Sequence, residues 1–598
     1  MLAARLALRH GTLIFTPASF TAVKSIPLTV RSASTDAKLS FYDKYLGPAS
    51  VIASPSFKSR WLVAVPACLT HMCIGAPYAW SVLAEPLSRE LGFVVSSADD
   101  WGLGTTAVPM SILFALHGIS AAIAAKWQIK HGPRTSIGLA GLCFGGGFML
   151  TSAGVLLHNF PLICGGFGIL SGCGLGLAYT PPIQCLMDWF PDRKGVASGL
   201  TIMGFGSGAL VFTPVAGYLM KKMAVLPTFM GGLNSDVILE NGRYFMKDVS
   251  GKLVEVVNAN SSDIARLPFK LTEGYYAVGS GSTGVAATLA ITGLCYSAIM
   301  LTSAVTIRKP HQNYLDNFKK FSPKSVDERY VELDQAMRTP QFYALAASLM
   351  CIASGGMGFF AVAKTMMSDT FGGALPSVVT ATFCSSFIMM LACGNLSGRI
   401  IWASVSDKIG RPATLNMFAL GSCALYLSLP ALVSVASHTG STLPLITFCG
   451  ASALTISFFG GIYSILPAYE ADIFGAKYVG AIHGRMLLAS TCAALLGPSM
   501  LLSLRNHSQS NAIYALIDKI DPSALKEKFG DMALANLDQL ISSKTITISK
   551  LMEIVPEGIP DPTPFIYNTP FYAMSSLMAM AALAHYTIKP LPKKYFKN

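Results

Sequence analysis

Charged residues are scarce in this 598-residue sequence, where Asp, Glu, Lys and Arg together make up 13%, against roughly 25% in soluble domains. Hydrophobic residues make up 52%. A soluble protein needs charged side chains on its surface, whereas lipid surrounds a surface that has few of them. The net charge is +13, but the basic residues stand at the ends of apolar runs, which is typical of membrane topology rather than nucleic-acid binding. The composition therefore excludes an ordinary soluble protein.

The polar parts of the chain contain no cysteine. All 13 cysteines lie inside apolar runs, from Cys68 to Cys492, so the sequence indicates neither a disulfide framework nor a metal site. The glycine-rich run at 204–208 has no preceding strand and no Gly-Lys-Ser/Thr ending, which excludes a nucleotide-binding loop. We therefore expect no cofactor, no metal and no enzymatic centre.

Long apolar runs recur along most of the chain. About 20 mostly apolar residues are needed for a helix to cross the hydrocarbon core. Twelve spans are predicted near 61–84, 101–125, 136–156, 161–187, 196–219, 283–306, 341–363, 376–402, 413–434, 444–468, 479–504 and 571–588. The predicted fold class is an all-α polytopic membrane protein with twelve transmembrane helices in two six-helix halves.

Polar segments divide the chain into domains. We expect an N-terminal tail at 1–58, a six-helix bundle at 59–306, a basic linker at 307–340, a second six-helix bundle at 341–590 and a basic tail at 591–598. The two bundles carry polar inserts at 220–282 and 505–570, predicted to form small caps. Basic short loops, linker and tail share one side of the membrane by the positive-inside rule, so both inserts are expected on the other side.

Short charged loops occur at corresponding places in the two halves. The loops that follow spans two and eight contain Lys130, Gly132 and Arg134, and Asp407, Gly410 and Arg411. The loop at 188–195 after span four has a counterpart at 470–477 after span ten. Two like halves joined by a basic linker are what alternating access by rocking bundles requires. These loops are predicted to be conformational switches, where helix ends pair in one state and separate in the other.

This organisation resembles the major facilitator superfamily. Within it, several stretches are similar to the oxalate–formate antiporter group, relatives of the monocarboxylate transporters. These stretches are 75–81, 179–182, 189–195, 204–209 and 395–399. The resemblance implies a secondary transporter that moves small organic anions.

Arg399 is the predicted anchor for the substrate anion. An ionisable group inside a span costs several kcal/mol and is a functional candidate by default. A guanidinium stays charged, and its planar fork matches a carboxylate. The family resemblance also implies an arginine here that binds the carboxylate. The alternative is that Arg399 extends to the basic side of the membrane, because Asp407 is only about two turns away.

Asn395 and Ser490 mark departures from the related families. Asn395 precedes Arg399 by one helical turn. The resemblance to monocarboxylate transporters implies that the matching position in that family is an aspartate used in proton coupling. We expect Asn395 to orient Arg399 or to bind substrate; joining helices is the alternative. The antiporter group has a second cation, a lysine, where alignment places Ser490, so a monoanion is expected to bind more easily than a dianion. Arg485 and Lys364 are the alternatives for a second cation.

Aromatic and imidazole side chains complete the set of candidate site residues. The resemblance implies that Tyr78 contacts substrate and that Phe459 and Tyr463, one turn apart, line the cavity; ordinary helix packing is the alternative. His71 lies near the middle of the first span and is a candidate for binding and releasing a proton in each cycle. A lone membrane histidine more often joins helices by hydrogen bonds.

Acidic residues are missing from the predicted middles of the spans. Glu85 is near a span end, and Asp188, Glu470 and Asp472 are assigned to loops. This placement favours an exchanger or facilitator over a proton symporter driven by a carboxylate.

The first 35 residues contain no acid but include Arg5, Arg9, Lys24 and Arg31 with several serines and threonines. This composition resembles a mitochondrial transit peptide. A cytosolic tail is one alternative, and N-glycosylation triplets at 260–262 and 506–508 favour the secretory route instead. The expected location is the mitochondrial inner membrane, with the plasma membrane or another organelle as alternatives.

The sequence therefore predicts an alternating-access carrier for short monocarboxylates such as pyruvate, lactate or formate. It is expected to work as a monomer in the lipid bilayer and to bind no nucleic acid. A dicarboxylate exchanger of the oxalate type is the alternative within the same class. An anion sensor that does not transport is the alternative from another class, but it needs an output module that the 307–340 linker does not supply.

Overall fold

The computed structural model describes most of the chain. The described residues are 45–597 without 46, 55–58, 103–104, 241–242, 249–250, 265–266, 268, 322–328, 530–536, 538–540, 542–545 and 557. The predicted transit peptide at 1–35 and most of the N-terminal tail at 1–58 lie outside these residues.

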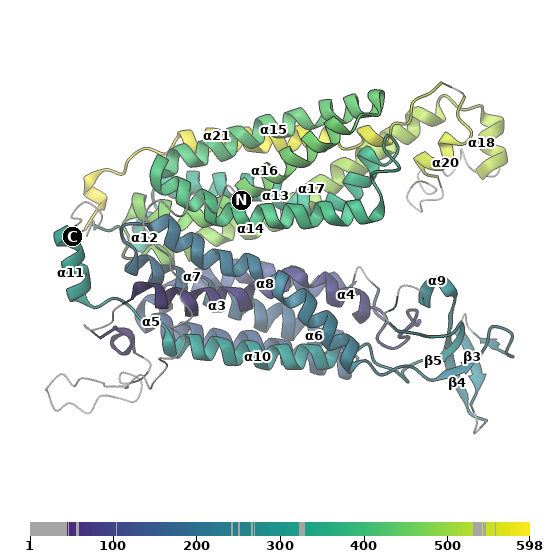
Figure 1. The fold of residues 1–598 in the computed structure, drawn as a ribbon, viewed down its shortest axis with the longest axis horizontal. Helices are drawn as coiled ribbons and strands as arrows, with labels where there is room; N and C mark the ends of the chain where they lie inside the picture. Colours follow the sequence, from purple (N-terminus) through teal and green to yellow (C-terminus); the bar gives the residue numbers. More distant parts are fainter. Residues whose placement is uncertain are drawn as a thin grey trace, which may run out of the picture.

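Long helices lie side by side in two bundles (Figure 1). The N-terminal bundle contains α3 (Ala64–Gly75) and α4 (Ser81–Leu87), α5 (Val108–Leu156), α6 (Phe160–Ile163) and α7 (Gly172–Trp189), α8 (Lys194–Met223) and α10 (Val285–Thr306). The C-terminal bundle contains α13 (Pro340–Phe371), α14 (Ala381–Ile409), α15 (Arg411–Thr439), α16 (Thr442–Phe474), α17 (Val479–Ile517) and α21 (Asn568–Tyr586). Within the described part of the chain, ten helical stretches are long and apolar enough to cross a membrane.

Two glycines reverse the chain after the second and the eighth span. Gly132 has a φ of 80° and divides α5 into two helical segments, which correspond to two predicted spans. Gly410 has a φ of 88° and separates α14 from α15. A residue with a side chain rarely adopts this left-handed backbone, so glycine is required at both turns. With α5 counted as two spans and α21 in the place of the twelfth, the helices are consistent with two six-helix halves.

The insert of the N-terminal half folds as a five-stranded antiparallel sheet, which the sequence analysis did not predict. Its strands are β1 (Phe229–Gly231), β2 (Ile238–Glu240), β3 (Arg243–Lys247), β4 (Leu253–Ala259) and β5 (Gly274–Ala277), in the order β1-β5-β4-β3-β2. A short helix, α9 (Ser261–Ile264), follows β4. Tyr275 and Tyr276 on β5 and Val256 and Val257 on β4 are buried, so both faces of the central strands carry apolar side chains.

An ion pair joins this sheet to the loop after the first span. Arg243 donates to both oxygens of Asp99 at 2.7 Å and to Glu255 at 3.1 Å. The hydrogen bond from Arg243 holds the pKa of Asp99 below its ordinary value. Because this pKa is lowered, the pair still attaches the sheet to the bundle within the usual range of Asp titration, and it is lost only as the pH falls through the lowered pKa.

The insert of the C-terminal half begins as a continuation of its last long helix. The predicted span ends at 504, but α17 continues to Ile517. Ile513 and Leu516 are buried, and the extended end of α17 packs against α20 (Ile548–Met552). Another short helix, α18 (Pro522–Phe529), lies between them in sequence. Apolar side chains inside a largely polar segment are the physical reason for the longer helix.

The linker and the inserts lie at opposite ends of the bundles. Figure 1 shows α11 (Gln312–Phe321), α12 (Leu333–Ala336) and the C-terminus at one end, and the β-sheet with α18 and α20 at the other. We call these the linker end and the insert end. Both inserts are thus on the side opposite the basic linker, as the positive-inside rule predicted.

Candidate functional site

Arg399 lies on α14, where the two halves of the protein meet. Arg399 is 5% exposed, and its Nη1 donates a hydrogen bond to the carbonyl oxygen of Ile202 on α8 at 2.9 Å. The guanidinium carbon lies 5.7 Å from the centre of the Phe205 ring, also on α8, within the range of a cation–π contact. Arg399 therefore faces the other half of the protein and does not extend to the basic side.

Glycines on α8 allow this close approach of the halves. A Cβ atom at Gly199 would lie 2.8 Å from the carbonyl oxygen of Arg399 and 2.6 Å from the Cβ of Ala403. A Cβ at Gly206 would lie 3.3 Å from the Nε of Arg399. Small residues let helix backbones come together in membranes. The glycines of α8 thus place the guanidinium between the bundles.

Asn395 orients Arg399. Its Oδ1 accepts a hydrogen bond from the Nε of Arg399 at 3.3 Å. Its Nδ2 is buried and has no hydrogen-bond partner among the described residues. An aspartate at this position would neutralise Arg399, whereas the amide leaves the positive charge intact and adds a buried donor beside it. A guanidinium beside a free amide donor is a set of donors that suits an oxyanion.

Tyr78 lies on the N-terminal side of this site. Its ring is 5.0 Å from that of Phe114 and 5.3 Å from that of Phe205, which also contacts Arg399. The residue is nevertheless 44% exposed. Solvent therefore reaches the site at Tyr78, whereas Arg399 itself is covered.

Tyr463, Ser490 and Phe459 lie on the C-terminal side. The hydroxyls of Tyr463 on α16 and Ser490 on α17 are hydrogen-bonded at 2.7 Å, and both residues are buried. The rings of Phe459 and Tyr463 are 5.7 Å apart. Tyr463 also interacts electrostatically with Arg399 and Tyr78. The six residues proposed from the sequence to bind substrate are thus brought to one region between the halves.

His71 is buried next to this region. Its Nδ1 lies 3.3 Å from the carbonyl oxygen of Ala67, and its Nε2 has no partner among the described residues. Its ring is 5.2 Å from that of Tyr179, which is also 5.0 Å from the ring of His117 and 5.9 Å from that of His483. The sequence analysis singled out His71 but did not predict a group of three histidines around one tyrosine.

The acidic residues assigned to loops are in helices instead. Asp188 is the penultimate residue of α7, and Glu470 and Asp472 lie in the last turns of α16. Glu470 is fully buried, and its Oε1 lies 3.0 Å from the Nδ1 of His483, which is 1% exposed. The spans were predicted too short here because hydropathy falls at charged residues, although packing against the other half covers these helix ends.

Asp407 caps a helix of the opposite half at the linker end. Its two oxygens accept hydrogen bonds from the backbone N–H groups of Gly195 and Val196 at 3.0 Å each, at the start of α8. A carboxylate at a helix N-terminus is stabilised by the free N–H groups and the helix dipole. Arg411 binds Asp407, its partner within the same half. These hydrogen bonds from Gly195 and Val196 to Asp407 connect the two halves at the linker end, and we call them the latch.

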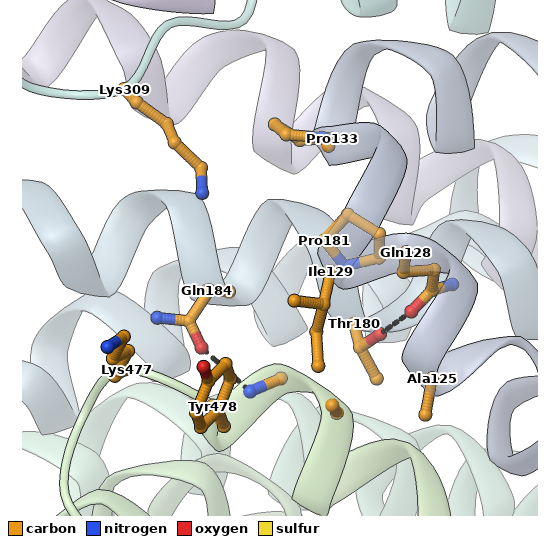
Figure 2. A pocket seen from close by; sticks show the side chains of 13 residues that line it. Ala125, Gln128, Ile129, Pro133, Thr180, Pro181, Gln184, Lys309, Lys477 and Tyr478 are labelled. Carbon is orange, nitrogen blue, oxygen red and sulfur yellow. Dashed lines mark hydrogen bonds between the residues drawn. The ribbon is translucent and has the colours of Figure 1, made fainter. Parts of the chain in front are cut away.

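Gln184 does the same for the start of α17. Its Oε1 accepts from the N–H of Gly480 at 2.7 Å, and its Nε2 donates to the carbonyl oxygen of Ala476 at 2.9 Å. Gln184 lines a cavity of about 100 Å³ between the halves, toward which Lys309 extends (Figure 2). Gly132 and Lys477 line the same cavity.

The linker bridges both halves through Asp334 of α12. Lys126 on α5 lies 2.6 Å from this carboxylate, and Arg485 on α17 lies 3.2 Å from it. These two cations hold the pKa of Asp334 below its ordinary value. Arg485 therefore binds the linker and does not supply the second cation of the substrate site that the sequence analysis considered.

Among the described residues, no hydrogen bond or ion pair joins the predicted switch residues of the first half to the second half. Lys130 is exposed. Arg134 donates to carbonyl oxygens of Tyr45, Ala304 and Val305, all in the N-terminal half or its tail. Among the described residues, the hydrogen bonds and ion pairs between the halves lie from the linker end to the middle of the spans, such as those of Asp407, Gln184 and Arg399. The structure is closed at the linker end.

Comparison with known proteins connects this geometry to a family. The apicoplast pyruvate carrier 1 of Toxoplasma gondii is 25% identical over 480 residues, which cover 72% of this chain and 80% of the carrier. The oxalate:formate antiporter of Oxalobacter formigenes is 25% identical, covering 73% of this chain and 83% of the antiporter. YhjX, an uncharacterized MFS-type transporter of Escherichia coli, is 23% identical, covering 73% and 87%. No family profile matches the sequence.

Solved structures agree on the fold. A fucose:proton symporter of Escherichia coli superimposes with a TM-score of 0.52 at 12% identity, covering 88% of this chain and 99% of the symporter. An outward-facing bacterial homologue of the iron transporter ferroportin gives a TM-score of 0.50 at 10% identity, covering 88% and 98%. The chain is therefore a homologue of major facilitator transporters, has their fold, and resembles the oxalate–formate antiporter and monocarboxylate transporter group.

Proposed function

We propose that this protein is an alternating-access carrier of short monocarboxylates in the pyruvate and formate class. The observation that carries the proposal is the guanidinium of Arg399, buried between the halves and oriented by Asn395, whose amide N–H₂ has no described partner. The named activities of the related pyruvate carrier and oxalate:formate antiporter support a small carboxylate as substrate.

The state of the structure fits one half of a transport cycle. The halves are latched at the linker end, and the sheet and α18 stand apart at the insert end (Figure 1). Tyr78, whose ring contacts the Phe205 ring beside Arg399, is exposed, whereas Arg399 is buried. We infer that substrate enters from the insert end, binds Arg399, and leaves at the linker end after the latch opens.

A monoanion suits the charge of the site better than a dianion. Arg399 is matched by one carboxylate, and Arg485 is bound to Asp334 of the linker. Lys364 on α13 is exposed and stands one helical turn beyond Phe360, whose ring is 6.3 Å from that of Phe459. This position near the aromatic side of the site keeps a dicarboxylate as the second candidate, with Lys364 as its second cation.

Counterflow in proteoliposomes tests the proposal. Vesicles loaded with unlabelled pyruvate or formate are expected to take up the same labelled anion, and vesicles loaded with oxalate are expected to do so much more slowly. Uptake without an internal anion separates uniport from exchange. Protein-free vesicles correct for diffusion of the neutral acids. If oxalate exchanges fastest and Lys364→Gln abolishes that exchange, the protein is a dicarboxylate exchanger instead.

Asn395→Asp is expected to reduce monocarboxylate counterflow about tenfold or more. The new carboxylate would lie within hydrogen-bond distance of the Nε of Arg399, because Asn395 already does at 3.3 Å, and a charged pair of this kind competes with substrate for the guanidinium. Asn395→Gln, which keeps an amide, serves as the matched variant. Counterflow of the aspartate variant at the wild-type rate would contradict the role given to Asn395.

We also propose an organelle membrane, the mitochondrial inner membrane, as the location of the protein. The support is the acid-free, arginine-containing composition of residues 1–35. Co-localisation of the full chain, tagged at its C-terminus, with a mitochondrial marker tests this, and a plasma-membrane signal would contradict it.

A further inference from the structure

Glu470 and His483 form a buried acid–imidazole pair that the substrate site does not use. They lie on α16 and α17, 3.0 Å apart between Oε1 and Nδ1, and are 0% and 1% exposed. A buried carboxylate in a membrane protein is costly and is seldom present without a function. The pair lies toward the linker end from Tyr463 and Ser490, each of which is about two turns away along its helix.

The pair is only half satisfied by hydrogen bonds. Within the described residues, neither Oε2 of Glu470 nor Nε2 of His483 has a partner. With one proton shared between them, as Glu⁻ with His⁺ or as two neutral groups, the pair has no net charge. With no proton its net charge is −1, and with two it is +1. Burial disfavours a net charge by several kcal/mol, so the closed state favours the form with one proton.

Tyr179 of the opposite half contacts His483 of this pair. Its ring stacks on that of His483 at 5.9 Å and 23°, and a Cβ at Gly484 would lie 2.9 Å from the carbonyl oxygen of Ala121 on α5. The Tyr179 ring also contacts His71 and His117, whose Nε2 atoms likewise lack described partners. Arg399 interacts electrostatically with His71 and with Tyr179. Polar groups thus extend from the pair to the substrate site.

The described charged side chains on the neighbouring elements form ion pairs with one another and not with Glu470 or His483. Lys194 on α8 and Arg411 on α15 both pair with Asp472, and Arg411 also binds Asp407 of α14. Asp334 of the linker binds Lys126 and Arg485. His585 on α21 lies 3.0 Å from the hydroxyl of Tyr469 and 2.6 Å from Oδ1 of Asn416, so both its ring nitrogens have partners. Within the described part of the chain, the ring contacts leave Tyr179 next to His483 and, through Tyr179, the two other histidines as groups that can exchange a proton with the pair.

We propose that Glu470 and His483 are the proton-binding site of this carrier, and that one proton moves with each carboxylate. The proposal rests on the proposed transport of a monocarboxylate. In the state seen here, a proton from the insert end reaches the pair past His71 and Tyr179. When the linker end opens, α17 separates from α5 and α7, and water reaches His483. A Glu and a His in water hold no shared proton at pH values above about 6.5, so the proton is released there with the substrate.

Accumulation driven by a pH gradient tests this proposal. In vesicles with the membrane potential held at zero and an outside pH about one unit below the lumen, the wild type is expected to accumulate labelled pyruvate about tenfold. One pH unit is a tenfold ratio of proton concentrations, and electroneutral one-to-one symport converts it into an equal ratio of pyruvate concentrations. Glu470→Gln is expected to give a ratio near one, while its pyruvate–pyruvate counterflow at equal pH continues. A pH-sensitive dye in the lumen should report acidification with the wild type alone.

Three further variants complete the experiment. His483→Gln is expected to behave like Glu470→Gln, and Glu470→Asp is expected to retain accumulation. His585→Gln changes another buried histidine, one whose two ring nitrogens both have partners. This variant is expected to accumulate pyruvate as the wild type does. If Glu470→Gln accumulates normally, or if the wild type exchanges pyruvate without accumulating it, the proton site is refuted while the carrier function stands. If the wild type exchanges no monocarboxylate, the carrier function fails and the proton site fails with it.

Discussion

Arg399→Ala is expected to lower monocarboxylate counterflow by about 100-fold or more. The guanidinium offers charge-assisted hydrogen bonds to the anion, worth about 1.5–3 kcal/mol each, and loss of two such bonds corresponds to a factor of about 10² or more. The affected quantity should be substrate binding, since Arg399 is 5% exposed and lies where the halves meet. Counterflow of labelled pyruvate at equal pH measures it.

Two variants show whether the fork or only the charge is needed. Arg399→Lys keeps a positive charge but loses the planar pair of donors, so we expect counterflow between that of the wild type and that of Arg399→Ala. Arg505→Ala is the control and should leave counterflow unchanged. Arg505 is another arginine on a long helix of the C-terminal half, its partner is Asp369 at 3.0 Å, and it lies beyond Leu501 on α17, away from the candidate site. Normal counterflow by Arg399→Ala would remove the basis for the anion site.

Asp407→Asn is expected to shift the protein toward the state that is open at the linker end, and to slow transport about tenfold. The carboxylate accepts two N–H bonds at the start of α8, in the other half. Replacing a charge at a helix N-terminus by an amide costs roughly 1 kcal/mol or more, which is enough to change the ratio of two states several-fold. Spin labels at the exposed positions 130 and 408, in a chain whose native cysteines are replaced, should report a larger population of long distances.

Asp192→Asn is the control for this measurement. Asp192 also lies at the linker end, but its partner at 2.7 Å is Arg60 of the same half. Its substitution should leave the distances between the halves unchanged, although it also removes a carboxylate from the linker end. Equal distance distributions for Asp407→Asn and the wild type would show that the latch does not determine the state of the carrier.

The helices of the membrane region could be predicted because hydropathy measures the same quantity that places them in lipid. The predicted run at 444–468, for example, lies inside α16, and the run at 413–434 lies inside α15. The sheet of the first insert could not be predicted this way. Its strands are three to seven residues long and mix charged with apolar residues, as in β3, so no apolar run marks them.

The candidate site could be predicted in part. Arg399 is conspicuous because a permanently charged group inside an apolar run has few explanations, and Asn395 follows from its place one turn earlier. Glu470 was missed because it stands near Asp472 and a glycine, in the pattern of a loop. In the folded protein its helix continues to Phe474, and it is fully buried against His483.

The sequence by itself determined the helical membrane fold, the order of its spans, the opposite placement of the linker and the inserts, and the presence of a charged residue inside one apolar run. It did so because a run of about 20 apolar residues in lipid has one stable solution, a helix. Only the tertiary structure decided which polar groups meet: Asp407 with the start of α8, Glu470 with His483, and Tyr179 between three histidines. These contacts join residues far apart in the chain, and whether they form depends on how closely the two halves pack, which hydropathy along the chain does not encode.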